Sequence, residues 1–269
     1  MTNQNQSAIS LGGRVVLITG SVGGIGWRLA ETFADAGNLV MLHGWGDPAE
    51  IEEASTLMRR AYEGRVEFIK ASVSTSEEMA DVVRMAQTKW GAIDILINDA
   101  GVTDALPITE SPFDRWRTIQ ETILNRSYHT IRTAVPLMKK RGWGRILQLA
   151  PSPGPVGSPL ETAYFSAKYA LMGLIKSVAL ETAECGITCN AICPGNVRTP
   201  SIDSKVREQA RIQATSKDQC IGDVILANQP AKRFVTVEEI AALAVYLCTE
   251  SARSITGTCI PIDGGSSAG

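Results

Sequence analysis

Short apolar runs alternate with longer helical patterns along almost the whole chain, and this alternation restricts the fold more than any other feature. Between the runs lie segments such as 77–90 and 112–140, whose apolar positions recur at helical spacing. Strands that alternate with helices of this length predict βαβ units with right-handed crossovers, and hence a parallel sheet covered on both faces. We therefore expect an α/β fold, a single doubly wound domain over residues 1–269 with about seven strands. The runs expected to form strands are RVVLIT, NLVMLH, RVEFIK, IDILIN, GRILQLA, ITCNAIC and GTCIPI.

The composition is that of a soluble globular chain and argues against several function classes. Hydrophobic residues make up 44% and charged residues 20% of the 269 positions, which is enough apolar material for a sizeable core. A net charge of −2 gives no support to a nucleic-acid partner or an anionic membrane. The polar segment 1–10 lacks the order of a secretory signal, and no apolar run reaches the length of a membrane span. We expect a cytoplasmic protein with a flexible N-terminus.

The cysteines predict neither a disulfide framework nor a metal centre. Six cysteines are few for a disulfide scaffold in a chain of this length. Cys185, Cys189 and Cys193 have a spacing that resembles a metal site, but the chain offers no companion histidine beside them. Cys189 and Cys193 also fall in the strand-like run ITCNAIC, where a free cysteine acts as a small hydrophobic residue. We therefore expect no metal site.

A glycine-rich turn follows the first expected strand and opens the first expected helix, in the segment VVLITGSVGGIGWRLAETFADAG. Gly20, Gly24 and Gly26 would let the backbone approach a pyrophosphate at the amino terminus of the helix, where free N–H groups and the helix dipole favour an anion. Gly37 stands where this helix should end. The strand–turn–helix context predicts a dinucleotide site. The alternative is that the glycines serve only a tight turn.

Five motifs in order carry a family resemblance that covers nearly the whole chain. They are the glycine-rich turn from Thr19 to Gly26, NDAG at 98–101, the pair Tyr164-x-x-x-Lys168, PGNVRT at 194–199 and DGG at 263–265. Together they resemble the short-chain dehydrogenase/reductase family, whose members have a single Rossmann-type domain. The segments GWGDPAEIE, LMKKRGWGRI and ALETAECGITCNAICPGNVRTP look most like bacterial D-3-hydroxybutyrate dehydrogenases within that family.

The resemblance implies a catalytic pair and also shows two departures from the family pattern. Tyr164 takes the place of the general acid/base, and Lys168 that of the cation that holds the nicotinamide ribose and lowers the pKa of the tyrosine. The family serine that polarises the substrate oxygen belongs thirteen residues before the tyrosine, where this chain has Pro151; Ser152 is one residue out of register. The asparagine of the proton relay is replaced by Ile123. Losing an oxyanion donor typically costs ~10²–10³ in rate.

The end of the second expected strand, which selects the cofactor, favours NAD over NADP. No lysine or arginine stands in residues 42–47 or in the loop 21–23, so a 2′-phosphate would lack a partner. Trp45 is a candidate contact for the adenine end, or else a packing residue. Ser72 replaces the aspartate that usually meets the adenine amino group in the family. The resemblance places the following residues at the cofactor: Gly20, Ser21, Gly24, Ile25, Gly26, Trp45, Ser72, Asn98, Ala100, Gly101, Tyr164, Lys168, Pro194, Gly195, Val197 and Thr199.

The expected substrate pocket departs from that of the hydroxybutyrate dehydrogenases. Their carboxylate-binding lysine, three residues before the tyrosine, is replaced by Glu161, and the accompanying histidine and glutamine by Pro153 and Thr103. If Glu161 faces the pocket, it repels a small carboxylate; the alternative is a solvated loop acid. We therefore expect that 3-hydroxybutyrate is not the substrate and that a neutral polyol or a cationic hydroxy compound fits better. The residues expected at the substrate are Thr103, Pro153, Glu161 and Asn196.

These observations leave three hypotheses for function. The first is an NAD(H)-dependent oxidoreductase that acts on a secondary alcohol or ketone. The second is a divergent non-redox enzyme that uses Tyr164 and Lys168 for proton transfer, as in a lyase or isomerase, and the third is a catalytically silent binding subunit. The resemblance further implies a homotetramer formed through the helices 112–140 and 162–184. The polar segment 199–230 has no expected strand, and we expect a mobile helical flap over the site.

Overall fold

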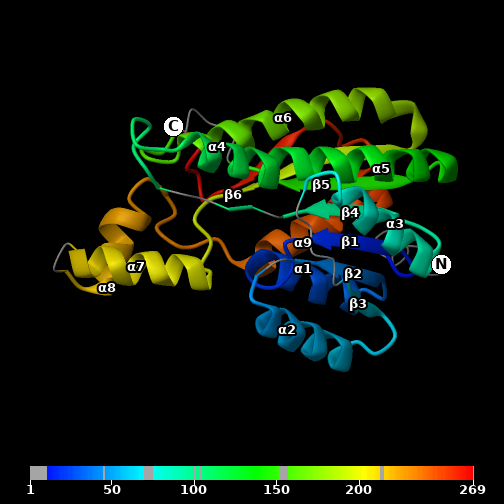
Figure 1. Cartoon of the computed structure of the whole chain (residues 1–269), viewed down its shortest axis with the longest axis horizontal. Helices are drawn as coiled ribbons and strands as arrows, with labels where there is room; N and C mark the ends of the chain where they lie inside the picture. The colour runs from blue at the N-terminus through cyan, green and yellow to red at the C-terminus, as the bar shows by residue number, and fades with distance from the viewer. Residues whose placement is uncertain are drawn as a thin grey trace, which may run out of the picture.

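A seven-stranded parallel sheet forms the centre of the computed structural model, which describes residues 11–44, 46–69, 75–99, 101–102, 105–151, 157–212 and 215–268, without the side chains of residues 200, 201, 205 and 209 (Figure 1). The strand order is β3-β2-β1-β4-β5-β6-β7, and all neighbouring strands pair in parallel. The predicted α/β doubly wound fold is therefore confirmed. The strands are β1 (Val15–Thr19), β2 (Leu39–His43), β3 (Val66–Phe68), β4 (Ile95–Asn98), β5 (Gly144–Leu149), β6 (Ile187–Pro194) and β7 (Cys259–Ile262).

Helices cover both faces of the sheet, as continuously apolar strands require. One face packs against α1, α2 and α9, through residues such as Phe33, Met58 and Ile240, and the other against α3, α5 and α6, through residues such as Val82 and Ile131 (Figure 1). The helices are α1 (Gly24–Asp35), α2 (Pro48–Ala61), α3 (Met79–Trp90), α4 (Phe113–Gln120), α5 (Arg126–Arg141), α6 (Thr162–Thr182), α7 (Pro200–Ile212), α8 (Lys217–Cys220) and α9 (Val237–Cys248), with short turns η1 (Glu121–Asn125), η2 (Ala183–Cys185), η3 (Ile221–Ile225) and η4 (Glu250–Ala252).

The long helix expected over 112–140 is interrupted in the middle. A π-helical turn, η1, separates α4 from α5 and inserts one extra residue into the helical repeat. Ile123 lies in this turn and is completely buried. A methyl group on Gly101 would stand 3.9 Å from Ile123 Cγ1 and 3.8 Å from Lys168 Nζ, so the π turn faces the neighbourhood of the lysine. Helical periodicity alone could not predict this turn.

The strand order reverses between β1 and β4, and this topological switch point determines where a ligand can bind. Because all strands are parallel, their carboxyl ends meet at one edge of the sheet. In the described part of the segment 199–230, residues 200–212 and 217–225 are helical, as expected, and form α7, α8 and η3, which extend to the side of the sheet in Figure 1. Val206, Ala210 and Cys220 give this flap a small core of its own. Its mobility stays a prediction.

Candidate active site

The carboxyl edge of the sheet holds a cavity of about 690 Å³. Its walls come from the glycine-rich turn, the ends of β4, β5 and β6, the start of α6 and the flap. The cavity therefore has the size and the position of a cofactor and substrate site in a doubly wound fold. The predicted site residues that line it are Ile25, Gly101, Glu161, Tyr164, Lys168, Pro194, Gly195, Asn196, Val197 and Thr199.

The glycine-rich turn has the geometry of a close-approach loop. Gly20 and Gly24 adopt left-handed backbone angles, with φ of +78° and +59°, which other residues adopt only with strain. A methyl group on Gly26 would stand 2.5 Å from the carbonyl oxygen of Gly20, so a side chain cannot fit there without a shift of the backbone. A methyl group on Gly24 would meet Thr199 Cγ2 at 3.6 Å. The turn and the start of the flap, far apart in sequence, are therefore neighbours.

Tyr164 and Lys168 lie one turn apart on α6 and both line the cavity. The lysine side chain is buried, and its Nζ donates a hydrogen bond to the carbonyl oxygen of Leu149 at 2.7 Å. The same nitrogen stands over the ring of Tyr164, 5.7 Å from the ring centroid. Burial lowers the pKa of Lys168, while the charge of Asp99 acts in the opposite direction. The predicted pair is thus brought together at the end of β5.

The electrostatics around Tyr164 differ from what the resemblance implies. The pKa of Tyr164 is raised to about 12, first by burial and then by the negative charges of Glu161 and Asp99. The sequence-based expectation was a pKa lowered by Lys168. The physical reason for the difference is that burial disfavours the charged phenolate and two carboxylates add to this effect, whereas the lysine nitrogen stands over the ring and bonds to Leu149. A further positive charge at the site would be needed to favour the phenolate.

Asp99 is a site residue that the sequence patterns did not identify. It follows β4 directly, lines the cavity and accepts a hydrogen bond from the backbone N–H of Gly26 in the first turn of α1. Burial raises the pKa of its carboxyl group to about 7, although Lys168 and the Gly26 N–H oppose the rise. The motif NDAG at 98–101 includes this acid, but the motif does not show that its carboxyl group reaches the glycine-rich turn.

Pro151 and Ile123, the two departures from the family pattern, both lie in the described part of the chain. Pro151 follows the end of β5 and lines the cavity, and it brings neither a hydroxyl nor an N–H group. Ile123 lies beside Gly101 and Lys168, and its main-chain oxygen accepts a hydrogen bond from Ser127 Oγ at 2.8 Å. Several predicted residues lie outside the described part of the chain: Trp45, Ser72, Ala100, Thr103, Ser152 and Pro153.

Two predicted cofactor residues have polar side chains that turn into the protein. The hydroxyl group of Ser21 is buried and donates to the carbonyl oxygens of Ile18 and His43. Asn98 Oδ1 accepts hydrogen bonds from Thr19 Oγ1 at 3.4 Å and from Thr130 Oγ1 at 3.1 Å. These contacts tie β1 to β2 and to β4, and β4 to α5. Both side chains thus stabilise the strands and the helix that surround the site.

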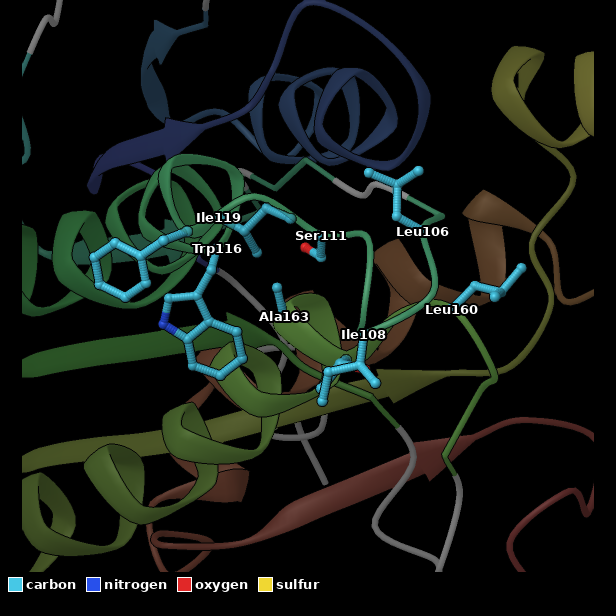
Figure 2. Close-up of a pocket in the computed structure, with 9 residues that line it drawn as sticks. Leu106, Ile108, Ser111, Trp116, Ile119, Leu160 and Ala163 are labelled. Atoms are coloured by element: carbon cyan, nitrogen blue, oxygen red, sulfur yellow. The ribbon is translucent and has the colours of Figure 1, made fainter.

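A second, smaller hollow of about 210 Å³ lies on the outer side of the turn that enters α6 (Figure 2). Leu160, Trp116 and Ala163 line it, as Figure 2 shows, whereas Glu161 and Tyr164 line the main cavity. Leu160 has a φ of +70°, a strained value for a branched residue, and its carbonyl oxygen accepts a hydrogen bond from Leu106 N. The turn 157–161 therefore lies between the main cavity and this smaller hollow, which is lined mostly by apolar side chains.

A doubly wound sheet with a glycine-rich turn after β1 and a Tyr–Lys pair on the helix after β5 defines a class of dinucleotide-dependent enzymes, and comparison with known proteins agrees. Residues 20–267 match the family model described as "Enoyl-(Acyl carrier protein) reductase". The chain belongs to the short-chain dehydrogenase/reductase family.

Relatives and solved structures of similar sequence cover nearly the whole chain. The D-beta-hydroxybutyrate dehydrogenase of Rhizobium meliloti is 43% identical over 94% of this chain and 98% of its own, and that of Cupriavidus necator is 39% identical over 95% and 98%. The predicted likeness to this group is thus confirmed. The structure of L-sorbose reductase from Gluconobacter frateurii, complexed with NADPH and L-sorbose, has a TM-score of 0.89 at 30% identity, covering 96% of this chain and 98% of that one.

The described residues hold neither a cluster of possible metal ligands nor a helix that could span a membrane. Within those residues, no three His, Cys, Asp or Glu side chains gather as a possible metal site. None of the helices in the described segments has both the length and the apolar character that crossing a membrane requires.

Proposed function

We propose that the protein is an NAD(H)-dependent oxidoreductase that interconverts a secondary alcohol and a ketone. The observation that carries the proposal is that Tyr164 and Lys168 line the same cavity as Ile25 of the glycine-rich turn. Gly26, where a side chain would collide with Gly20, gives the turn the close backbone approach that a pyrophosphate needs. The residues present therefore fit a dinucleotide.

The roles of the two catalytic residues follow from their positions. A bound nicotinamide supplies the hydride acceptor for the alcohol carbon, or the hydride donor for the ketone. Tyr164 Oη takes the hydroxyl proton during oxidation and returns it during reduction. Lys168, anchored on Leu149, adds positive charge beside the phenol and holds the cofactor ribose. Thr199, beside Gly24, helps to position the nicotinamide half.

NAD is the proposed cofactor rather than NADP. The end of β2 and the following loop carry no lysine or arginine that could bind a 2′-phosphate. Asp47 in this loop caps α2, because its Oδ1 accepts hydrogen bonds from the N–H groups of Ala49 and Glu50. The structure of L-sorbose reductase carries NADPH, so the choice of cofactor is open to a direct test.

The proposed substrate carries no carboxylate close to the reacting carbon. Glu161 lines the cavity, and its negative charge acts on the phenol of Tyr164. A carboxylate bound near this pair would be repelled, whereas a polyol or a cationic hydroxy compound would not. We therefore propose that 3-hydroxybutyrate is not the substrate, although relatives 43% and 39% identical are hydroxybutyrate dehydrogenases. Thr103, Pro153 and Asn196 complete the proposed substrate site.

A second candidate function has an observation of its own. Pro151 and Ile123 remove the oxygen-polarising and relay groups of the family, and both residues sit at the site. This pattern favours a non-redox proton-transfer enzyme or a silent binding subunit. We also propose one domain, a homotetramer formed through the helices 112–140 and 162–184, and a cytoplasmic location.

Substitution of the tyrosine separates these functions. We expect Tyr164→Phe to abolish turnover of any secondary alcohol while NADH binding stays within about threefold of wild type, because the phenol acts in the proton transfer. Turnover would be followed by NADH absorbance over a panel of polyols and amino alcohols. A Tyr164→Phe protein with wild-type turnover would contradict the proposed role, and failure of the wild type to bind NADH would favour the second candidate.

A further inference from the structure

Asp99 occupies a junction between the two halves of the site. It is the first residue after β4, and its backbone N–H donates to the carbonyl oxygen of Thr19 at the end of β1, at 3.2 Å. The strand order reverses between these two strands, so Asp99 stands at the topological switch point. The strand order and this backbone hydrogen bond therefore place the carboxyl group of Asp99 at the cavity.

The carboxyl group of Asp99 reaches the first turn of α1. It accepts a hydrogen bond from the backbone N–H of Gly26, and a methyl group on Gly26 would stand only 3.0 Å from Asp99 Oδ2. The amino end of α1 is also where the phosphates of a dinucleotide bind in this kind of fold. The acidic side chain of Asp99 thus lies close to the place where the phosphates of a dinucleotide are expected.

The charged and titratable groups around Asp99 come mainly from α6. The positive charge of Lys168 favours the ionised form of Asp99 and lowers its pKa, while the negative charges of Glu161 and Asp99 raise the pKa of Tyr164. Cys193 on β6 adds a thiol beside Lys168. Burial outweighs the lysine and brings the pKa of Asp99 to about 7, so both protonation states exist near neutral pH.

We propose that Asp99 is a further cofactor-binding residue and that it holds the dinucleotide in its protonated form. The inference rests on the proposed function. A neutral carboxyl group has the hydrogen-bonding pattern of a carboxamide: its C=O accepts the Gly26 N–H, and its O–H is left to donate to an oxygen of the cofactor. An ionised carboxylate has no such donor and repels a phosphate.

Binding of the cofactor is therefore coupled to the uptake of one proton at alkaline pH. Affinity for NADH stays constant below pH about 7 and falls by up to about tenfold per pH unit above it, because the ionised form must first be protonated. Asp99→Asn supplies the donor at every pH. In that variant the affinity should be flat over the same range and, at pH 8.5, at least fivefold tighter than in the wild type.

Titration of Lys168 would also weaken binding at high pH, and the Asp99→Asn variant separates the two causes. The negative charge of Asp99 raises the pKa of Lys168, so removing that charge moves the lysine titration to lower pH. If Lys168 causes the loss of NADH affinity at high pH, this loss should begin at lower pH in Asp99→Asn than in the wild type. If Asp99 causes it, the loss should disappear in Asp99→Asn.

Calorimetric titration with NADH tests the inference. The experiment is run at pH 6 and pH 8.5, each time in two buffers with different heats of ionisation, which gives the protons bound per cofactor. We expect nearly one proton at pH 8.5 and none at pH 6 for the wild type, and none at either pH for Asp99→Asn. The matched control is Asp114→Asn, at an exposed aspartate paired with Arg117 on α4, which should behave as wild type.

Each remaining outcome decides the question. NADH binding by the wild type without proton uptake overturns the inference and leaves the proposed function intact, whether or not Asp99→Asn folds. Proton uptake that persists in Asp99→Asn also overturns it, because the proton then goes to another group. If neither protein binds NADH at either pH, the proposed function fails and the inference fails with it.

Discussion

Lys168 Nζ donates a hydrogen bond of 2.7 Å to the carbonyl oxygen of Leu149, and this bond ties the helix that carries Tyr164 to the end of β5. Leu149 lies two residues before Pro151, so the lysine is anchored beside the position where the family serine would stand. The proposed catalytic pair is thus anchored to the end of β5, beside the position where the family serine is replaced by Pro151. Under the proposed function, Tyr164 and Lys168 would transfer the proton, and polarisation of the carbonyl would fall to other groups or to the substrate.

Gly26→Ala should abolish detectable NADH binding. The new methyl group would stand 2.5 Å from Gly20 O and 2.9 Å from Ser21 Cα, so the glycine-rich turn must move. Overpacking of this kind costs about 1–3 kcal/mol of unfolding free energy. Denaturant unfolding and fluorescence titration measure both effects. Gly12→Ala is the matched control, because its methyl group would make an ordinary 3.5 Å contact with Ala36 O; equal losses in both variants would contradict the role of the turn.

Asp99→Asn should stabilise the fold at alkaline pH. The pKa of Asp99 is about 7 in the folded protein and 3.8 for an unperturbed aspartate. Folding therefore takes up a proton when the pH lies between these two values. The stabilisation from the raised pKa is complete below pH about 4 and is lost as the pH rises through about 7. The difference in unfolding free energy between Asp99→Asn and the wild type should therefore change with pH. It should favour the variant by on the order of 1–3 kcal/mol more at pH 8 than at pH 4.

Urea unfolding of both proteins between pH 4 and pH 8.5 measures this difference. A constant gap between the two proteins over that range would show that the carboxyl group of Asp99 titrates normally in the fold. Asp114→Asn, on the exposed surface of α4, again serves as the control.

Restoring the two missing polar groups should raise the rate of hydride transfer. In Pro151→Ser with Ile123→Asn, the hydroxyl group would polarise the substrate oxygen, and we expect a rise of about 10–100-fold in kcat. Ile123 is completely buried, so its replacement by Asn should cost about 1–3 kcal/mol of unfolding free energy. The control is Ile123→Val, which keeps the site apolar. An unchanged kcat with intact NADH binding would favour the non-redox candidate.

Glu161→Lys should change the preferred charge of the substrate. The wild type should oxidise 3-hydroxybutyrate at no more than background rate with NAD, whereas the variant places a cation near Tyr164 that can bind a carboxylate. Glu161→Gln removes the repulsion without adding attraction and should fall between them. Steady-state kinetics with 3-hydroxybutyrate and an amino alcohol measure the change. Robust oxidation of 3-hydroxybutyrate by the wild type would sink this account of the pocket.

The sequence predicted the fold because its signals are local and repeated. Apolar β-branched runs such as VVLIT and ILIN became buried strands, and the glycine-rich turn followed β1 as expected. The spacing of Tyr164 and Lys168 likewise needed only the helical repeat to bring them together.

The features that the sequence did not predict depend on contacts between distant segments. The bond from Lys168 to Leu149 and the contact of Asp99 with Gly26 each join two different elements of the fold. The π turn at Ile123 lies between the consecutive helices α4 and α5, where the apolar helical pattern shows no break. The inward-turned side chains of Ser21 and Asn98 have the same origin, since their partners lie on neighbouring strands or on α5. Local patterns carry no information about such pairings.

Binding of NADH and then NADPH to the purified protein tests the central claim most directly. The titration follows cofactor fluorescence and the quenching of emission from the five tryptophans. We predict saturable binding of NADH, with NADPH at least about tenfold weaker because no cation meets a 2′-phosphate near residues 42–47. Tighter binding of NADPH would contradict the proposed cofactor, and absence of binding to either would contradict the assignment of this protein as a hydride-transfer enzyme.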